Sequence, residues 1–219
     1  MFYIRTVRGN CSKFGVSRVP HVRESVEFTQ NHTDQGRGFW IMDYGVRIAN
    51  IVATATLEST LDLIELERKI PMSQLKPKKF SGLLIRILKP YKALAQVYSN
   101  GKITVNGPCS TPAGSLELAK RFCKLINKCG GYSCTISNFK IVNIVGTCSL
   151  HRQIELGSLS KLLESEYKCN FNPEIFPGLR LRLSDCSAVV FRTGKCNLLG
   201  GKSVEDLQAA YIELQIIIP

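Results

Sequence analysis

Apolar and polar side chains alternate along the stretch NIVATATL, which begins at Asn50. Because successive side chains of a strand point to opposite faces, Ile51 and Ala53 would face one way and Val52 and Thr54 the other. An antiparallel sheet of such strands packs one face on the core and leaves the second face open. The stretch therefore predicts a strand with one side in a core and the other side available for contact.

The same pattern occurs a second time, as NIVGTCSL from Asn143. Two further matches follow in the same order: KPKKFSGLLIRI (76–87) resembles NPEIFPGLRLRL (172–183), and VYSNGKI (97–103) resembles VFRTGKC (190–196). Ordered matches of this kind indicate an internal repeat with a unit of about 90 residues. We therefore expect two structural units with the same order of elements.

Within each unit, the first strand leads into a short amphipathic helix, predicted over 61–70 and 154–164. A turn that contains proline then leads to a strand starting after Phe80 in the first unit and Phe176 in the second. Two more strands form a hairpin in each unit, and a glycine of SNGK or RTGK supplies its turn.

A longer helix closes each unit, over Gly114–Cys129 in the first and Val204–Ile216 in the second. The pair Gly130-Gly131 after the first of these helices is a strong stop signal. Strands joined by short turns pair antiparallel, and the helices then cover one face of the sheet. The predicted fold class is therefore α+β, with two units joined edge to edge into a pseudo-twofold sheet whose other face is open.

The repeat divides the chain into 46–138, called unit one, and 139–219, called unit two. Residues 1–45 have no counterpart in the repeat and are expected to form an N-terminal extension. No apolar run reaches the roughly 18 residues that a membrane span needs, so we expect a soluble intracellular protein. The nine cysteines are scattered without a C-x-x-C pair, which favours reduced, buried thiols over a metal site.

The formal net charge is +12 at pH 7. Residues 46–138 hold fourteen Lys and Arg against five Asp and Glu, so the positive charge is concentrated in unit one. A lopsided basic chain suggests a polyanionic partner, although a basic surface that only keeps the protein soluble gives the same count.

Asparagine and valine recur on the open side of the two matching strands. The minor groove of DNA presents mainly acceptor atoms at A·T pairs, so Asn50 and Asn143 could donate to them. Val52 and its counterpart Val145 would fit the groove floor without leaving a polar group unpaired. The alternative is that each asparagine only begins a strand, and the recurrence in both units favours the functional interpretation.

Aromatic side chains also recur in pairs: Phe80 and Tyr98 in unit one, and Phe176 and Phe191 in unit two. Aromatic and apolar side chains inserted between base steps unstack them and kink the duplex. Core packing is the usual role of phenylalanine. Phe80 and Phe176 lie just before a glycine at the start of a strand, which fits a wedge better than a core position.

Residues 46–219 resemble the TATA-box-binding protein family, in NIVATATL, KPKKFSGLLIRILKP, SNGK, FKIVNIVGTCSL, NPEIFPGLRLRL and FRTGK. The resemblance implies a saddle made of a curved ten-stranded antiparallel sheet with four helices on its convex face. It also implies binding in the minor groove of A·T-rich double-stranded DNA, bending of the duplex, and action in the nucleus. The partners implied are TFIIB-like and TFIIA-like factors and the RNA polymerase initiation machinery.

The resemblance also assigns roles to individual positions. It places groove contacts at Asn50, Val52, Thr104, Asn106, Asn143, Val145 and Val189, and intercalating aromatics at Phe80, Tyr98, Phe176 and Phe191. Contacts to the DNA backbone fall on Lys79, Arg86, Lys102, Arg182 and Lys195. The partner-binding positions are Glu174 and Ile175 in a projecting loop, and Lys120, Arg121, Lys124 and Lys128 on the long helix of unit one.

Several positions depart from the family pattern. Tyr98 stands for a phenylalanine, Gln96 for a leucine, and Ala49 and Val142 for the glutamines before each groove asparagine; Asn106 and Leu199 replace threonines, and Asp185-Cys186 replaces a basic-proline corner. These departures motivate an alternative function, a related scaffold with weak or sequence-tolerant DNA contact that acts through protein partners. An enzyme is not expected, because no nucleophile triad, metal cluster or helix-hairpin-helix with a catalytic aspartate stands out. No cofactor is expected either.

Overall fold

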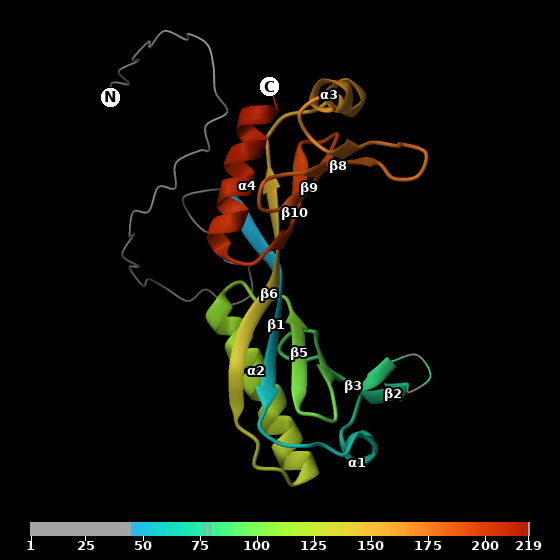
Figure 1. The fold of residues 1–219 in the computed structure, drawn as a ribbon, viewed down its shortest axis with the longest axis vertical. Coiled ribbons are helices and arrows are strands. Elements are labelled where there is room, and N and C mark those ends of the chain that lie inside the picture. Colours follow the sequence, from blue (N-terminus) through green and yellow to red (C-terminus); the bar gives the residue numbers. More distant parts are fainter. Residues whose placement is uncertain (1–44, 77, 79, 219) are drawn as a thin grey trace, which may run out of the picture. The chain divides into compact units, whose positions relative to one another are not determined.

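The computed structural model describes residues 45–76, 78 and 80–218, which form a ten-stranded antiparallel sheet with four helices. The first half contains β1 (Val46–Leu57), α1 (Leu63–Lys69), β2 (Ser73–Lys76), β3 (Phe80–Ile87), β4 (Ala93–Val97), β5 (Lys102–Gly107) and α2 (Pro112–Gly130). The second half contains β6 (Ile136–Ser149), α3 (Leu156–Leu163), β7 (Cys169–Asn170), β8 (Gly178–Arg182), β9 (Ser187–Phe191), β10 (Lys195–Gly201) and α4 (Val204–Ile217). The expected α+β fold with a curved ten-stranded sheet is confirmed (Figure 1).

The strand order across the sheet is β2-β3-β4-β5-β1-β6-β10-β9-β8-β7. Reading outward from the central β1–β6 pair, both halves place their strands in the same sequence, which is the symmetry that the repeat predicted. The predicted boundary between the two units, at residues 138 and 139, falls inside β6. The boundaries of the units therefore stay a prediction. The proposed extension, 1–45, lies outside the described residues except for Gly45.

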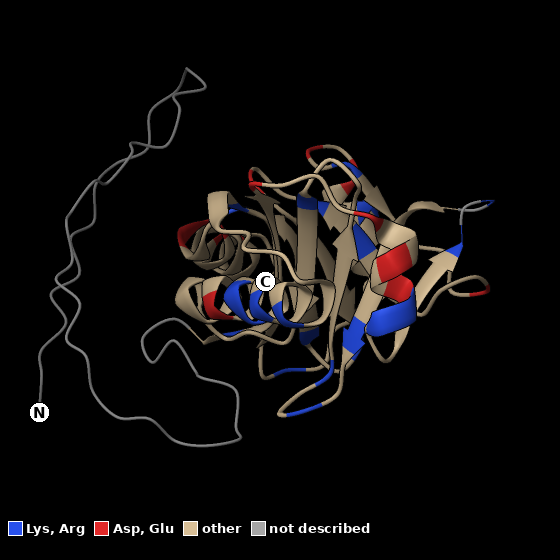
Figure 2. Ribbon diagram, turned by 90° about the horizontal axis from the view of Figure 1, so that it is seen from below, with Lys and Arg blue, Asp and Glu red and all other residues tan. Residues whose placement is uncertain are grey.

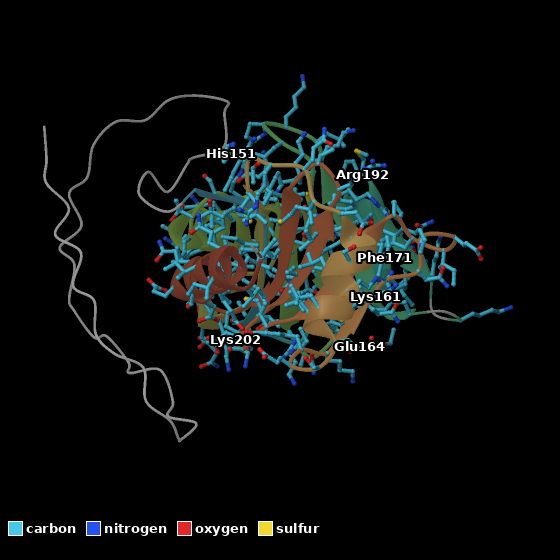
Figure 3. The ribbon with its side chains drawn as sticks, turned by 90° about the horizontal axis from the view of Figure 1, so that it is seen from above. His151, Lys161, Glu164, Phe171, Arg192 and Lys202 are labelled. Carbon is cyan, nitrogen blue, oxygen red and sulfur yellow. The ribbon has the colours of Figure 1, made fainter. Side chains whose placement is uncertain are left out.

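Helices α2 and α4 follow one another along the long axis of the molecule, on one face of the sheet (Figure 1). α2 contacts β1, β5 and β6, and α4 contacts β1, β6 and β10, so the two long helices cover the centre of the sheet. The short helices α1 and α3 lie at its two ends. Figure 3 looks onto the end formed by the second half, where Lys161 of α3 and Glu164, the C-cap of α3, lie at the surface. No helix in the described part of the chain is long and apolar enough to cross a membrane.

The core follows from the alternation in β1. Ile51, Ala53 and Leu57 face the helices and are buried, whereas Val52 and Thr54 on the other side remain partly exposed. Phe122 of α2 is the largest fully buried side chain of the layer that covers this face. Removing such apolar surface from water contributes about 25 cal/mol per Å², so the alternation fixes which face the helices must cover.

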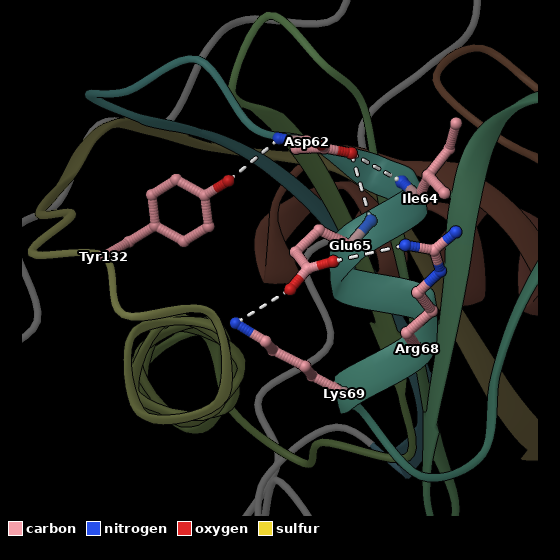
Figure 4. Close-up of polar contacts among 6 residues, drawn as sticks. All are labelled: Asp62, Ile64, Glu65, Arg68, Lys69 and Tyr132. Carbon is pink, nitrogen blue, oxygen red and sulfur yellow. Dashed lines mark hydrogen bonds and ion pairs between the residues drawn. The ribbon is translucent and has the colours of Figure 1, made fainter.

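Helix α1 is held at its start by a side-chain cap (Figure 4). The carboxylate of Asp62 accepts hydrogen bonds from the backbone N–H groups of Ile64 and Glu65, each at 3.0 Å. The backbone N–H of Asp62 itself donates to the Tyr132 hydroxyl at 2.9 Å, which connects the helix to the chain after α2. Glu65 also forms an ion pair with Lys69, at 3.0 Å, within the helix. The two hydrogen bonds to the Asp62 carboxylate satisfy N–H groups that a helix leaves free at its first turn.

The described cysteines are free thiols, and most of them are buried. Burial, together with the nearby carboxylates of Asp206 and Asp185, raises the pKa of Cys186 to about 11. A thiol with such a pKa stays protonated at neutral pH and behaves as a small apolar side chain.

The hairpin turn at Gly101 gives a test of the fold. Gly101 has φ +78°, and a Cβ added there would lie 2.1 Å from the carbonyl oxygen of Leu57. Gly131 has a similar φ of +74°, but an added Cβ would meet nothing within 4 Å. We expect Gly131→Ala to lower the free energy of unfolding by about 1 kcal/mol and Gly101→Ala by about 3 kcal/mol or more, as measured by urea unfolding. Equal losses in the two variants would contradict the close packing of this turn on β1.

Candidate nucleic-acid interface

The face of the sheet opposite α2 and α4, here called the open face, carries small and apolar side chains at its centre. Its floor is made of Val52, Thr54, Thr56, Thr104, Val145, Thr147, Val189 and Asn197, all partly exposed. Neighbouring strands place these residues in register: Thr54 lies opposite Thr104, and Thr147 lies opposite Asn197. The floor is therefore continuous across the two halves.

The described strands contain no Asp or Glu, but they contain eight Lys and Arg. These are Arg47, Lys76, Arg86, Lys102, Lys140, Arg180, Arg182 and Lys195, and all are exposed. A single sign of charge along one surface raises the local concentration of oppositely charged partners. The open face is thus suited to a polyanion.

The two groove asparagines are related across the β1–β6 pair. Asn50 lies opposite Val145, and Val52 lies opposite Asn143, with Ile51 and Ile144 between them on the core side. The predicted four residues are therefore brought together around the pseudo-twofold axis. Each half contributes one amide and one valine.

The orientation of Asn143 is fixed by the chain itself. Its side-chain oxygen accepts a hydrogen bond from the backbone N–H of Gly200 at 3.0 Å. The NH2 end of the amide then points away from Gly200 and is the end available to donate. Asn50 lines a hollow of the open face together with Asn106, Arg86 and Lys92.

Ala49 and Val142, the neighbours that depart from the family pattern, sit at irregularities of the β1–β6 ladder. The register shifts between Ile48 and Asn50, and again where Val142 is passed over. An extra residue in a strand bends it and breaks the alternation of faces. Ala49 and Val142 are consequently both exposed, directly beside the groove asparagines.

The four aromatic residues form two pairs at mirrored places of the sheet. The ring centroids of Phe80 and Tyr98 are 5.6 Å apart, and those of Phe176 and Phe191 are 6.1 Å apart. All four side chains are partly exposed rather than in the core. We call these the unit-one and unit-two aromatic pairs.

A glycine lies beneath each of these pairs. A Cβ added at Gly178 would lie 2.8 Å from the Phe176 ring, and one added at Gly82 would lie 2.7 Å from the Phe80 ring. The spacing Phe-x-Gly in both units therefore lets the ring lie across its own strand. This close approach explains why glycine follows each phenylalanine.

Four of the five residues predicted to contact the DNA backbone lie on strands of the open face. Arg86, Lys102, Arg182 and Lys195 are exposed on strands of the open face, and the Arg182 guanidinium donates to the Ser187 hydroxyl at 3.1 Å. Lys79 lies outside the described residues.

The predicted partner positions lie apart from the open face. Glu174 and Ile175 are in the loop between β7 and β8, where Ile175 is 81% exposed. Lys120, Arg121, Lys124 and Lys128 lie on α2, whose successive turns are basic in Figure 2. Lys120 pairs with Glu117 at 2.6 Å, and Arg121 donates to the Lys89 carbonyl at 3.3 Å.

Four of the eight basic strand residues are absent from the sequence prediction: Arg47, Lys76, Lys140 and Arg180. Arg47 and Lys140 occupy equivalent places, opposite Thr147 and Thr54 respectively. Arg180 lies opposite Val189, and its guanidinium carbon is 4.8 Å from the Phe176 ring centroid. Strand alternation was the signal that could have revealed them.

A profile described as "Transcription factor TFIID (or TATA-binding protein, TBP)" matches residues 45–129 and 138–218. The chain belongs to the TATA-binding protein family. A TATA-box-binding protein-like 1 of Entamoeba histolytica is 35% identical over 173 residues, which are 78% of each chain. A TATA-box-binding protein of Sulfolobus acidocaldarius is 35% identical over 167 residues, covering 75% of this chain and 82% of the relative.

Among solved structures, Methanococcus jannaschii TBP matches with a TM-score of 0.69 and 25% identity, over 78% of this chain and 97% of that one. The curved sheet and its four helices are thus the saddle-shaped TBP fold. TBP-family proteins are DNA-binding transcription factors rather than enzymes.

Proposed function

We propose that this chain is a transcription initiation factor that binds the minor groove of A·T-rich promoter DNA in the nucleus and bends it. The observation that carries the proposal is that the unit-one and unit-two aromatic pairs lie at equivalent places of the two halves of the sheet. The described strands between them contain Lys and Arg but no Asp or Glu. The TATA-box-binding names of the relatives support the same interpretation.

The centre of the open face suits the floor of the minor groove. A·T pairs present acceptor atoms there, and G·C pairs add the amino group of guanine. Asn50 and Asn143 would donate to the acceptors, and Val52 and Val145 would pack between them. A guanine amino group facing valine would lose its water without gaining a partner, at about 1–3 kcal/mol. The floor therefore favours A·T pairs at the centre of the site.

The aromatic pairs would act as wedges. Insertion between base steps costs a few kcal/mol per step and kinks the duplex, and the bend brings more of the protein into contact. The exposed lysines and arginines of the strands would neutralise phosphates on both sides, which makes the affinity fall steeply with salt.

The test measures binding and bending together. The full chain is titrated into a duplex labelled at both ends, once with an A·T-rich centre and once with a G·C-rich centre of equal length. We expect a gel-shifted complex and a shorter end-to-end distance by energy transfer with the A·T-rich duplex, and at least about tenfold weaker binding to the other. Binding without any change in end-to-end distance would overturn the bending step.

Partner recruitment is proposed for the loop between β7 and β8. A side chain as exposed as Ile175 on a projecting loop is an anchor for another protein, and Glu174 beside it supplies charge complementarity. We expect Glu174→Arg with Ile175→Asp to weaken binding of a TFIIB-like factor to the protein–DNA complex by about tenfold or more.

The control for this loop variant is Leu162→Asp, which changes another exposed apolar side chain, on α3. Both variants should bind the A·T-rich duplex as the natural chain does. A TFIIB-like factor that binds all three proteins equally, measured by a supershift titration, would rule out this loop.

A second candidate function is a TBP-related scaffold with sequence-tolerant DNA contact. Gln96 and Leu199 on the open face and the basic stripe of α2 favour it. In a competition experiment, unlabelled G·C-rich DNA would then displace the labelled duplex as well as A·T-rich DNA does. Preferential displacement by A·T-rich DNA favours the first proposal.

A further inference from the structure

The two halves of the open face differ in chemistry at two neighbouring pairs of equivalent strand positions. In the repeat, FSGLLIR (80–86) aligns with FPGLRLR (176–182), so Leu84 of β3 and Arg180 of β8 are equivalent positions in the two units. In the ladder, Leu84 is paired with Gln96, whereas Arg180 is paired with Val189. Unit one therefore presents an aliphatic side chain beside an amide, and unit two presents a cation beside an aliphatic side chain.

Arg180 is exposed on the open face, next to the unit-two aromatic pair. Its guanidinium carbon lies 4.8 Å from the centroid of the Phe176 ring, a distance at which a cation is attracted to the face of the ring. This contact holds the guanidinium beside the unit-two aromatic pair. If that pair is inserted into a base step, the base pair next to the kinked step would lie beside Arg180.

A guanidinium has five N–H donors and no acceptor. At an A·T pair the minor groove offers only acceptors, and the guanidinium can donate to them. At a G·C pair the guanine amino group is a donor in the middle of the groove, and it would oppose the guanidinium. Electrostatics acts in the same direction, because a positive side chain is drawn to minor grooves with enhanced negative potential.

The equivalent place in unit one should tolerate a G·C pair. Leu84 is neutral, and the side-chain oxygen of Gln96 beside it can accept a hydrogen bond from a guanine amino group. A G·C pair next to the unit-one aromatic pair is thus opposed less than one next to the unit-two pair.

We propose that Arg180 gives the DNA interface a direction: the unit-two half requires an A·T pair beside its aromatic pair, and the unit-one half accepts G·C there. This inference rests on the proposed function, since it assumes that the open face binds the minor groove. Without such a difference, a pseudo-twofold protein would bind a nearly symmetric A·T-rich site in both orientations with similar affinity.

The test reads orientation directly. A donor dye is attached by enzymatic ligation after the C-terminus, which follows α4 of unit two (Figure 1). The acceptor is placed at one or the other end of an A·T-rich duplex that carries a single G·C pair beside one kink position. We expect the natural chain to place unit two at the end without the G·C pair, with a bias of about tenfold.

Three variants complete the experiment. Arg180→Leu should bring the orientation bias close to unity, and the exchange Leu84→Arg with Arg180→Leu should reverse it. Arg68→Leu removes the same charge from the exposed surface of α1 and should keep the bias of the natural chain. A bias that persists in Arg180→Leu, or no bias in the natural chain, would overturn this inference while the proposed function stands. Failure of the natural chain to bind any A·T-rich duplex would overturn both.

Discussion

Replacing both rings of the unit-two aromatic pair, Phe176→Ala with Phe191→Ala, is expected to weaken binding to A·T-rich DNA by at least about 100-fold. The rings are partly exposed and 6.1 Å apart, and Gly178 beneath them leaves the strand free of a Cβ. The duplex should lose one of its two kinks, so the bend measured by end-to-end energy transfer should fall by about half.

The equivalent change in unit one, Phe80→Ala with Tyr98→Ala, should have the same effect, and all four changes together should leave the duplex straight. Ile216→Ala on α4 removes an exposed apolar side chain from the opposite side of the sheet and should change neither affinity nor bend. Thermal unfolding of each variant separates loss of binding from loss of folding. An unchanged bend in the four-residue variant would eliminate the wedge mechanism.

The sequence predicted the faces of the sheet well, because strand periodicity is rigid. Ile51, Ala53 and Leu57 had to share one face, and all three are buried. The repeat added the long-range information that a single strand lacks, since two units with one order of elements pair most simply through their first strands. The observed pairing of β1 with β6 follows that logic.

Helix ends show what local signals can and cannot give. The pair Gly130-Gly131 was predicted to stop the helix after Cys129; α2 extends one residue further, to Gly130, and Gly131 is its left-handed cap with φ +74°. The start was placed at Gly114, but the helix begins at Pro112, because the Thr111 hydroxyl accepts from the Gly114 N–H and proline fits the first turn. The Thr-Pro pair was visible in the sequence, so this difference reflects a missed signal.

Other features depend on contacts between distant segments. The irregularities at Ala49 and Val142 break the alternation on which strand prediction relies. The orientation of the Asn143 amide depends on Gly200, a neighbour that only the sheet brings close. Arg180 was missed for a different reason: the family pattern directs attention to the phenylalanines beside it, although alternation from Gly178 already places Arg180 on the open face.

The amide orientation leads to the second large effect. Asn143→Asp keeps the shape of the side chain and the oxygen that accepts from Gly200, so it changes only the outward NH2 group into a second oxygen with a negative charge. At the groove floor this oxygen would face the acceptor atoms of the bases, and the charge would be repelled by the phosphates. Asn50→Asp makes the same change on the other side of the β1–β6 pair.

We expect each aspartate variant to bind A·T-rich DNA about 10- to 100-fold more weakly than the natural chain, and the double variant more weakly still. Gln215→Glu, a change of one charge on α4 away from the open face, should leave the affinity within about twofold because its charge is far from the groove and screened by salt. The measurement is a salt titration of the dissociation constant for the natural chain and the four variants. If the outward amides donate to the bases, the loss in the aspartate variants should persist at high salt, where simple repulsion is screened. If the loss disappears at high salt, it comes from repulsion between the new carboxylate and the phosphates, and the asparagine amides do not donate hydrogen bonds to the bases.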